Sequence, residues 1–266
     1  MPSGVSAPGR ASIDQKTLRT DNWWRAPLIT FLLLSAWVLY AVVRTSSQRA
    51  YFVEKYHYLS PFSSPCVTAS CDSSTRDFGT WFGHFPGLIP FALITLPFLL
   101  GFRLTCYYYR KTYYRAFWLS PPACGVAEPH AKYSGETRFP LIMQNLHRYF
   151  WVAAGVISVI NSWDVIQAFR PPGHSFGFGL GTLIMLINVS LLWAYTLSCH
   201  SCRHIVGGRL RSFSRHPVRY KMWTFISKLN AKHQELAWTT LATLMITDAY
   251  IASVHAGYIS DLRFLN

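Results

Sequence analysis

The stretch from residue 176 to residue 197 reads FGFGLGTLIMLINVSLLWAYTL and contains no charged side chain. A helix needs about 20 mostly apolar residues to cross the hydrocarbon core of a membrane, and this stretch supplies them. A buried core helix of a soluble protein is the alternative, but such helices rarely run so long without a charge. The stretch therefore predicts a transmembrane helix and a membrane-protein fold.

Four further apolar stretches accompany this one. The five predicted spans cover about residues 24–43, 85–102, 139–169, 176–197 and 236–257. The second holds Pro86, Pro90 and Pro97, which a membrane span tolerates because neighbouring groups satisfy the freed carbonyls. Asp164 and Asp248 lie toward the outer half, where we expect pairing with polar neighbours or a place in a proton path. The pattern predicts an all-α integral membrane protein, a bundle of five transmembrane helices.

The composition narrows the function classes. Among the 266 residues, charged residues make up only 14%, against about 25% in soluble domains, yet the net charge is +14. Aromatic residues at 16% exclude intrinsic disorder, and six cysteines are too few for a disulfide scaffold. A chain that is both apolar and basic is either a nucleic-acid binder or a membrane protein with basic loops.

The positions of the charges decide between those two classes. Residues 198–235 carry eight Lys and Arg against one Glu, and residues 103–138 carry six against two. Residues 44–84 carry four against three acids, and residues 170–175 carry only Arg170. Because positive charge collects in cytoplasmic loops, the N-terminus and the two basic loops are predicted inside and the C-terminus outside. With the charge confined to one side, we expect no nucleic-acid partner.

Three regions follow along the chain. Residues 1–23 are polar and lack the apolar core of a signal peptide, so we expect a cytoplasmic tail. Residues 24–257 form the five-helix transmembrane domain, and residues 258–266 form a short outer tail. In the first outer loop, Cys66 and Cys71 occur in the run SPCVTASCDSS, and an oxidising compartment favours a disulfide between them over a metal site.

The chemistry is concentrated where the fourth span ends, in the run LSCHSCRHIVGG at residues 197–208. Cys199 and Cys202 are three residues apart, so both thiolates can reach one metal centre from a helical face or a helix-end turn. A reducing cytoplasm disfavours a structural disulfide here. A redox C-x-x-C motif belongs to a soluble α/β fold, which this chain lacks. The spacing therefore favours a metal site.

Five histidines are predicted at the same membrane depth as the two cysteines. They are His147, about 12 Å into the third span, and His200, His204, His216 and His233. Two Cys with two His suit a closed zinc site or a Rieske [2Fe–2S] cluster, whereas two His from facing helices suit haem b. The structural alternative is that the histidines lie at the membrane interface or form hydrogen bonds within the bundle, and bind no metal ion or cofactor.

Three segments resemble the cytochrome b-like membrane anchor subunit of actinobacterial and mycobacterial succinate dehydrogenases. They are NLHRYFWVAAG (145–155), LSCHSCRHIVGGRLRSFSRHPVRYKMW (197–223) and LNAKHQELAW (229–238). The resemblance covers roughly half the chain, and residues 1–100 add a compatible topology. It implies a multi-pass protein of the bacterial plasma membrane. Its implied partners are a flavoprotein subunit, an iron–sulfur subunit, a quinone (menaquinone is expected) and membrane lipid, with room for a higher oligomer of the complex.

The resemblance also implies a Rieske-type [2Fe–2S] cluster in place of haem. For its ligands we prefer Cys199 and Cys202 with His147 and His233, which would join the third, fourth and fifth spans. His200 and His204 are too close to the thiolates to reach the second iron if the helix continues there. If the helix unwinds, Cys202 and His204 form a C-x-H ligand pair like those of soluble Rieske loops, so His204 is the first reserve and His216 the second. The chain departs from the paired C-x-H and C-x-x-H loops of those proteins. A haem b anchor and a zinc-stabilised non-redox membrane scaffold remain the alternatives.

A quinone site needs an apolar slot and hydrogen-bond donors. The candidates beside His147 are Arg148, Tyr149 and Trp151, and those on the basic loop are His216, Arg219 and Tyr220. For each aromatic residue, packing against lipid is the plainer alternative. The chain has no nucleotide motif and no Gly-rich phosphate loop, so we expect it to be an enzyme subunit with no succinate chemistry of its own.

Overall fold

The computed structural model describes residues 22, 24–86, 89–113, 137, 141–208 and 210–265. The fold is mostly helical, as predicted. The α-helices are α1 (Arg25–Ser47), α2 (Leu96–Thr105), α3 (Tyr107–Tyr113), α4 (His147–Ala168), α5 (Leu180–Leu197), α6 (His200–Gly207), α7 (Pro217–Asn230) and α8 (His233–His255). The 3-10 helices are η1 (Glu54–Tyr56), η2 (Ser73–Thr75), η3 (Phe91–Ile94) and η5 (Leu141–Leu146). The predicted tail, apart from residue 22, and most of the basic loop 103–138 lie outside the described residues.

The all-α prediction is modified by two small antiparallel sheets. Strand β1 (Phe52–Val53) pairs with β2 (Tyr58–Leu59), and β3 (Phe178–Gly179) pairs with β4 (Arg263–Leu265). The second pair draws the C-terminal residues back onto the start of α5. The segment predicted as a short outer tail is therefore tied to the domain along most of its length.

The chain divides into two compact units. The first comprises residues up to Ala36 and Arg103–Leu146, and the second comprises Trp37–Phe102 and His147–Asn266. In the first unit, the buried Arg103 guanidinium donates to the Tyr109 hydroxyl at 2.8 Å. The Tyr113 hydroxyl donates to the Leu104 carbonyl at 3.0 Å.

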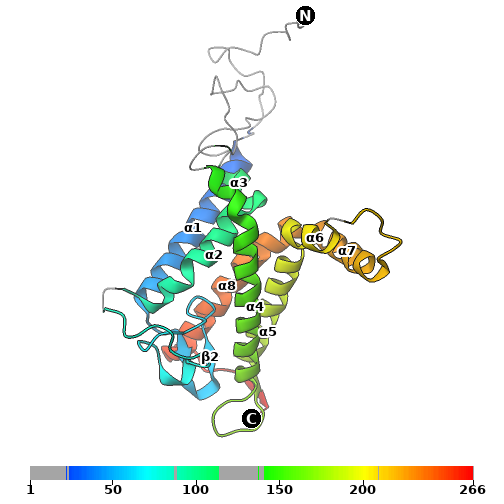
Figure 1. The fold of residues 1–266 in the computed structure, drawn as a ribbon. Coiled ribbons are helices and arrows are strands. Elements are labelled where there is room, and N and C mark those ends of the chain that lie inside the picture. The colour runs from blue at the N-terminus through cyan, green and yellow to red at the C-terminus, as the bar shows by residue number, and fades with distance from the viewer. Residues whose placement is uncertain are drawn as a thin grey trace, which may run out of the picture. The chain divides into compact units, whose positions relative to one another are not determined.

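The second unit is built around α5. This helix packs against both α4 and α8, and the three run side by side in Figure 1. Its lower half in that view meets a buried cluster in which Val165, Met185 and Ile251 pack with Tyr58 of β2. The fourth predicted span, which is recognised in the sequence by its lack of charged residues, is therefore a helix that packs against neighbours on two sides.

Among the described residues, three helices are long and apolar enough to cross a membrane. They are Arg25–Ser47, Ile142–Ala168 and Leu180–Leu197. The span predicted over residues 85–102 is shorter than expected: the only α-helix in its described part is α2, which begins at Leu96. Pro86 and Pro90 lie before it, and proline supplies no backbone donor for a helix interior. The fifth predicted span corresponds to α8, which has 23 residues but carries Asp248.

The third predicted span corresponds to the candidate span Ile142–Ala168, but its first part is not α-helical. Residues Leu141–Leu146 form a 3-10 helix, and α4 begins at His147 itself. His147 is therefore the first residue of the α-helical part of this span, and the residues before it are helical in the tighter 3-10 form. Apolar spacing shows that a segment is helical, but it does not separate a 3-10 turn from an α-helical turn.

Two buried aspartates fasten the loop of residues 48–84, predicted as the first outer loop, to the helices. Asp164 of α4 accepts a hydrogen bond from the Ser64 hydroxyl at 2.6 Å. Asp248 of α8 accepts from the Ser60 hydroxyl at 2.6 Å and from Arg44 Nε at 2.5 Å. Both acids thus pair with polar neighbours, one of the two roles expected for them. Cys66 and Cys71 of this loop form the predicted disulfide.

Candidate metal centre at the α5–α6 junction

The two candidate thiolates lie where α5 gives way to α6. Cys199 is the N-cap residue of α6, and its Sγ accepts from the Ser201 backbone N–H at 3.4 Å. Cys202 follows one turn later in the same helix. Cys199 is 1% exposed and Cys202 is 5% exposed, so both sulfurs are sheltered from water. Burial also raises the pKa of the Cys202 thiol, because a low-dielectric environment disfavours the thiolate.

His147 approaches this pair from α4. Its Nε2 lies 3.2 Å from Cys199 Sγ. The imidazole ring stacks on Phe102 with a centroid separation of 5.2 Å and an interplanar angle of 10°. A stacked ring has little freedom to rotate, so the first residue of α4 presents its Nε2 to the cysteine turn in a fixed orientation.

His233 approaches from the first position of α8 and is only 2% exposed. Its Nδ1 lies 2.6 Å from the Ser198 hydroxyl, and its ring stacks on Tyr195 at 4.9 Å with an interplanar angle of 7°. The Ser198 carbonyl in turn accepts from Asn230 Nδ2 at 2.7 Å. Ser198 directly precedes Cys199, so a continuous set of contacts links His233 to the cysteine turn.

The donor set can be compared with the metal centres that the sequence suggested. Within the described part of the chain, no three His, Cys, Asp or Glu side chains converge as a group that could hold a single metal ion. A closed zinc site would need four ligands on one ion. A Rieske cluster divides its ligands between two irons, two Cys on one and two His on the other. Two buried Cys and two orientated His from three helices fit that division.

The second ring nitrogen of a metal-bound histidine usually has a hydrogen-bond partner that fixes the tautomer. Ser198 provides such a partner for Nδ1 of His233, which leaves Nε2 as the coordinating atom if this residue is a ligand. His147 turns the same atom, Nε2, toward Cys199. The chemistry of the set therefore fits the implied cluster.

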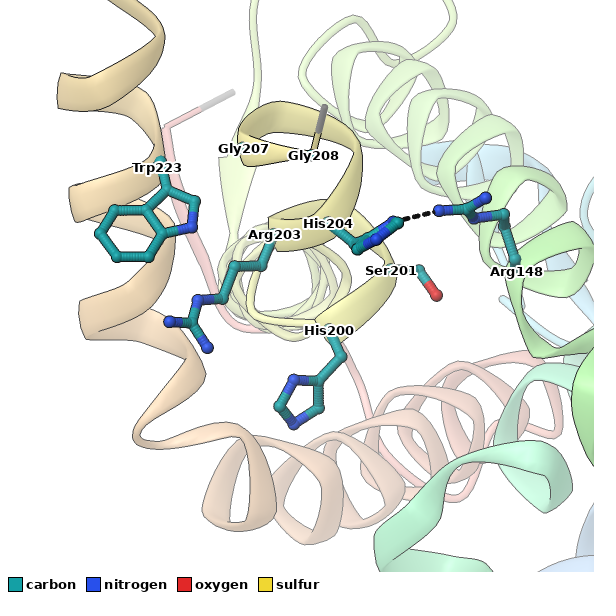
Figure 2. A pocket seen from close by; sticks show the side chains of 8 residues that line it. All are labelled: Arg148, His200, Ser201, Arg203, His204, Gly207, Gly208 and Trp223. Atoms are coloured by element: carbon teal, nitrogen blue, oxygen red, sulfur yellow. Dashed lines mark hydrogen bonds between the residues drawn. The ribbon is translucent and has the colours of Figure 1, made fainter. Parts of the chain in front are cut away.

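The reserve ligand His204 lies on the exposed side of α6, away from the buried side that holds Cys202. Its Nδ1 forms a short contact with the Arg148 guanidinium, and Figure 2 shows the two side chains pointing toward each other in the lining of a pocket. Helix α6 is continuous from His200 to Gly207. The helical structure is interrupted before His200, at Ser198 and Cys199, and not after Cys202, so the chain does not turn His204 toward the sulfurs. His216, the second reserve, is the N-cap residue of α7 and is exposed.

The pocket in Figure 2 has a volume of about 490 Å³ and lies against α4, α6 and α7. Its lining carries four basic or titratable nitrogen-bearing side chains, Arg148, His200, Arg203 and His204, together with Ser201, Gly207, Gly208 and Trp223. None of the described acidic side chains lines it. Arg148 is therefore the one sequence-predicted quinone candidate that faces this pocket.

The other quinone candidates are dispersed. The Trp151 indole donates to the Thr196 carbonyl at 2.9 Å, whereas Tyr149 is 72% exposed on α4. Tyr220 lies on α7 with His216 at its N-cap. Arg219 donates from Nε to the Val206 carbonyl at 2.9 Å and from its terminal nitrogen to the Gly208 carbonyl at 3.2 Å, which fastens α7 to the end of α6.

A profile of the family described as actinobacterial succinate dehydrogenase subunit SdhC matches residues 25–257, a range that contains both cysteines and all the candidate histidines. The chain belongs to this SdhC family. A chain in the solved structure titled "Mycobacterium smegmatis Sdh1 complex in the apo form" is 61% identical to it, with a TM-score of 0.90. That alignment covers 99% of this chain and 100% of the other. No curated protein matches the sequence.

Membership of the SdhC family confirms the resemblance drawn from the three sequence segments. The SdhC-family chain is the membrane anchor subunit of an actinobacterial succinate dehydrogenase, so it works as one subunit of an enzyme complex. Sequence reasoning missed Phe102, Tyr195 and Ser198, which orient the histidines. Tyr195 lies four residues before Cys199, a spacing that could have suggested a shared face; nothing in the sequence pointed to Phe102.

Proposed function

We propose that this SdhC-family chain carries electrons from the iron–sulfur subunit of succinate dehydrogenase to a quinone, in addition to anchoring the complex. The flavoprotein and iron–sulfur subunits would dock at the basic, cytoplasmic face. The chain would cross the bacterial plasma membrane five times, with its N-terminus inside and its C-terminus outside. The observation that carries the proposal is the buried Cys199–Cys202 pair with His147 Nε2 at 3.2 Å from Cys199 Sγ.

In this proposal Cys199, Cys202, His147 and His233 hold a Rieske-type [2Fe–2S] cluster. Such a cluster accepts and releases single electrons, and its two imidazole ligands raise its reduction potential above that of an all-cysteine cluster. The thiols must lose their protons to bind iron. Phe102 stacks on the imidazole ring of His147 and Tyr195 stacks on that of His233, which restricts the rotation of both rings. Ser198 fixes the tautomer of His233. These contacts keep the four donors in place.

For the quinone, the pocket of Figure 2 offers hydrogen-bond donors, several of them on α6, the helix that carries Cys202. Arg148 and Arg203 can donate hydrogen bonds to quinone carbonyl oxygens, and Trp223 supplies an apolar surface for the ring. His204, paired with Arg148, is a group that can deliver a proton at the pocket. Menaquinone is the expected species. Among the original candidates this favours Arg148 over Tyr149, which faces outward.

Low-temperature EPR of the purified, dithionite-reduced complex tests the assignment. The parent complex should give a Rieske-type signal in addition to the signals of the partner subunit, together with matching iron and acid-labile sulfide. His147→Ala and His233→Ala should each abolish the Rieske signal. His200→Ala is the matched control, because His200 belongs to the same junction but is exposed; this variant should keep the signal.

Three results would contradict parts of the proposal. Survival of the signal in His147→Ala or His233→Ala would remove that histidine from the ligand set. Haem absorption bands in the optical spectrum of the complex would instead support the haem b anchor. Zinc at this site with no redox signal would support a non-redox scaffold.

A further inference from the structure

Helix α7 turns its apolar side outward. Val218 is 70% exposed, Met222 is 50% exposed and Phe225 is 57% exposed. Together with the half-buried Leu229 they follow the spacing i, i+4, i+7, i+11, which places all four on one face of the helix. We call these four residues the apolar stripe.

The other side of α7 packs against α6 through polar and aromatic groups. Arg203 of α6 donates to the Ser227 hydroxyl at 3.0 Å and lies over the Trp223 ring at 4.9 Å from its centroid. A Cβ on Gly207 would collide with the Trp223 ring, so glycine permits this close approach. A helix at a water-facing surface buries its apolar face and exposes its polar one. Helix α7 buries the apolar Ile226 but leaves the apolar stripe exposed on another side, which indicates that something apolar covers the stripe.

The short connections on either side of the α6–α7 arm fix where it lies. Two residues separate α5 from α6, and two residues separate α7 from α8. The α6–α7 arm therefore stays at the end of the α4–α5–α8 bundle and projects sideways from it, as Figure 1 shows. With 14 residues, α7 is about 21 Å long.

The charges around the stripe identify what covers it. Residues 198–232 contain eight Lys and Arg and no Asp or Glu. Lys221 and Lys228 are exposed and share the side of α7 that borders the stripe. Lysine is depleted in the core of protein–protein interfaces. Basic amphipathic helices with an apolar face, in contrast, are suited to the surface of an anionic leaflet.

We propose that α7 lies in the plane of the cytoplasmic leaflet, with the apolar stripe among the acyl chains of anionic phospholipids. Lys221 and Lys228 then lie at the level of the lipid phosphates. Since α6 is fastened to α7 through Arg203 and Arg219, the lipid surface also supports the helix that carries Cys202. The leaflet assignment rests on the proposed topology; the contact with lipid does not.

Photo-crosslinking in the assembled complex tests this contact. A benzophenone amino acid replaces Phe225 in the stripe or, as a matched control, Tyr220, another exposed aromatic residue of α7 that lies on the opposite side from the stripe. The complex is placed in nanodiscs of phosphatidylglycerol and phosphatidylcholine and irradiated. Mass spectrometry should find phospholipid adducts at position 225 and none at position 220. A crosslink from position 225 to another subunit, or no lipid adduct there, would overturn the proposal.

The charge component has its own test. In equimolar nanodiscs, adducts at position 225 should favour phosphatidylglycerol, and a Lys221→Gln/Lys228→Gln variant should lose that preference while retaining adducts. Equal labelling of the two lipids by the parent complex would overturn the anionic preference. The leaflet assignment has a separate test, in which an impermeant maleimide is added to intact cells that carry Ser214→Cys. Labelling of position 214 in intact cells would overturn the leaflet assignment and the proposed topology, even if lipid adducts form.

Discussion

Ser198 shows how a single side chain can organise the candidate centre. It lies between the last residue of α5 and Cys199, is fully buried, and has its hydroxyl 2.6 Å from His233 Nδ1. Its carbonyl accepts from Asn230 at the end of α7. One residue without metal-binding chemistry of its own therefore joins three helix ends around the cysteine turn.

Replacing Ser198 by Ala should weaken the centre without removing a ligand. Loss of an outer hydrogen bond to a metal-bound histidine typically lowers metal affinity about 10–100-fold. We therefore expect Ser198→Ala complexes to lose iron and acid-labile sulfide under mild chelation faster than the parent. Ser201→Ala is the control, because Ser201 lies near the same turn but lines the pocket of Figure 2, whereas the Ser198 hydroxyl is the hydrogen-bond partner of His233 Nδ1. Equal iron retention in both variants would count against His233 as a ligand.

At the scale of elements, Asp248 connects three segments that are distant in sequence. Arg44 at the end of α1 donates to it from Nε at 2.5 Å and from a second nitrogen at 3.1 Å. The Ser60 hydroxyl of the outer loop and the Tyr40 hydroxyl donate at 2.6 Å each. A carboxylate with this many donors offsets its loss of hydration, so α8 can keep a charge within its apolar length.

Breaking this cluster should destabilise the protein measurably. Asp248→Ala leaves the Arg44 guanidinium without its carboxylate, and loss of one partner of a buried pair costs about 3–5 kcal/mol. Glu235→Ala on the same helix is the control: its contact with Lys232 is 3.8 Å long and its side chain is 61% exposed, so its loss should cost about 0–1 kcal/mol. Thermal unfolding of the detergent-solubilised complex, compared between the two variants, measures the difference. Equal melting temperatures would show that the cluster contributes little.

At the scale of the whole molecule, the distribution of charge carries the topology. The first loop, predicted to be outside, is fastened by the carboxylates of Asp164 and Asp248. Residues 198–232, in contrast, hold eight Lys and Arg and no acidic residue. In a membrane this asymmetry predicts that the α6–α7 arm is cytoplasmic and that the turn before α5 is outside. The whole surplus of positive charge then faces the anionic leaflet and the partner subunits.

Cysteine labelling of intact cells tests that orientation. A membrane-impermeant maleimide should label Ser175→Cys, in the exposed turn before α5, and should label Ser214→Cys on the arm only after lysis. Among the described residues, Cys106, Cys199 and Cys202 are buried and Cys66 is paired with Cys71. Cys124 lies outside the described residues, so the parent chain is the control that reports labelling at that position. The reverse labelling pattern would mean that the α6–α7 arm faces the outside of the cell. Labelling of both positions in intact cells would mean that the chain crosses the membrane an even number of times between residues 175 and 214.

Some of these features follow from the sequence and others do not. The 22 residues without charge at 176–197 predict the central helix, and three-residue spacing predicts that Cys199 and Cys202 lie within one turn. The shortening of the second span to α2, and the start of α4 at His147, escaped prediction, because apolar composition is similar in helical and non-helical segments of a buried region.

By itself, the sequence determined the membrane-protein class, the net charge of each loop, and the Cys and His residues available as candidate metal ligands. Hydropathy, charge and ligand chemistry are properties of individual residues and their spacing. Only the tertiary structure decided that His147 meets Cys199, that His204 turns to Arg148, and that α7 exposes its apolar face. Those outcomes depend on how α4, α5, α6 and α8 pack, and packing joins residues whose separation along the chain carries no local signal.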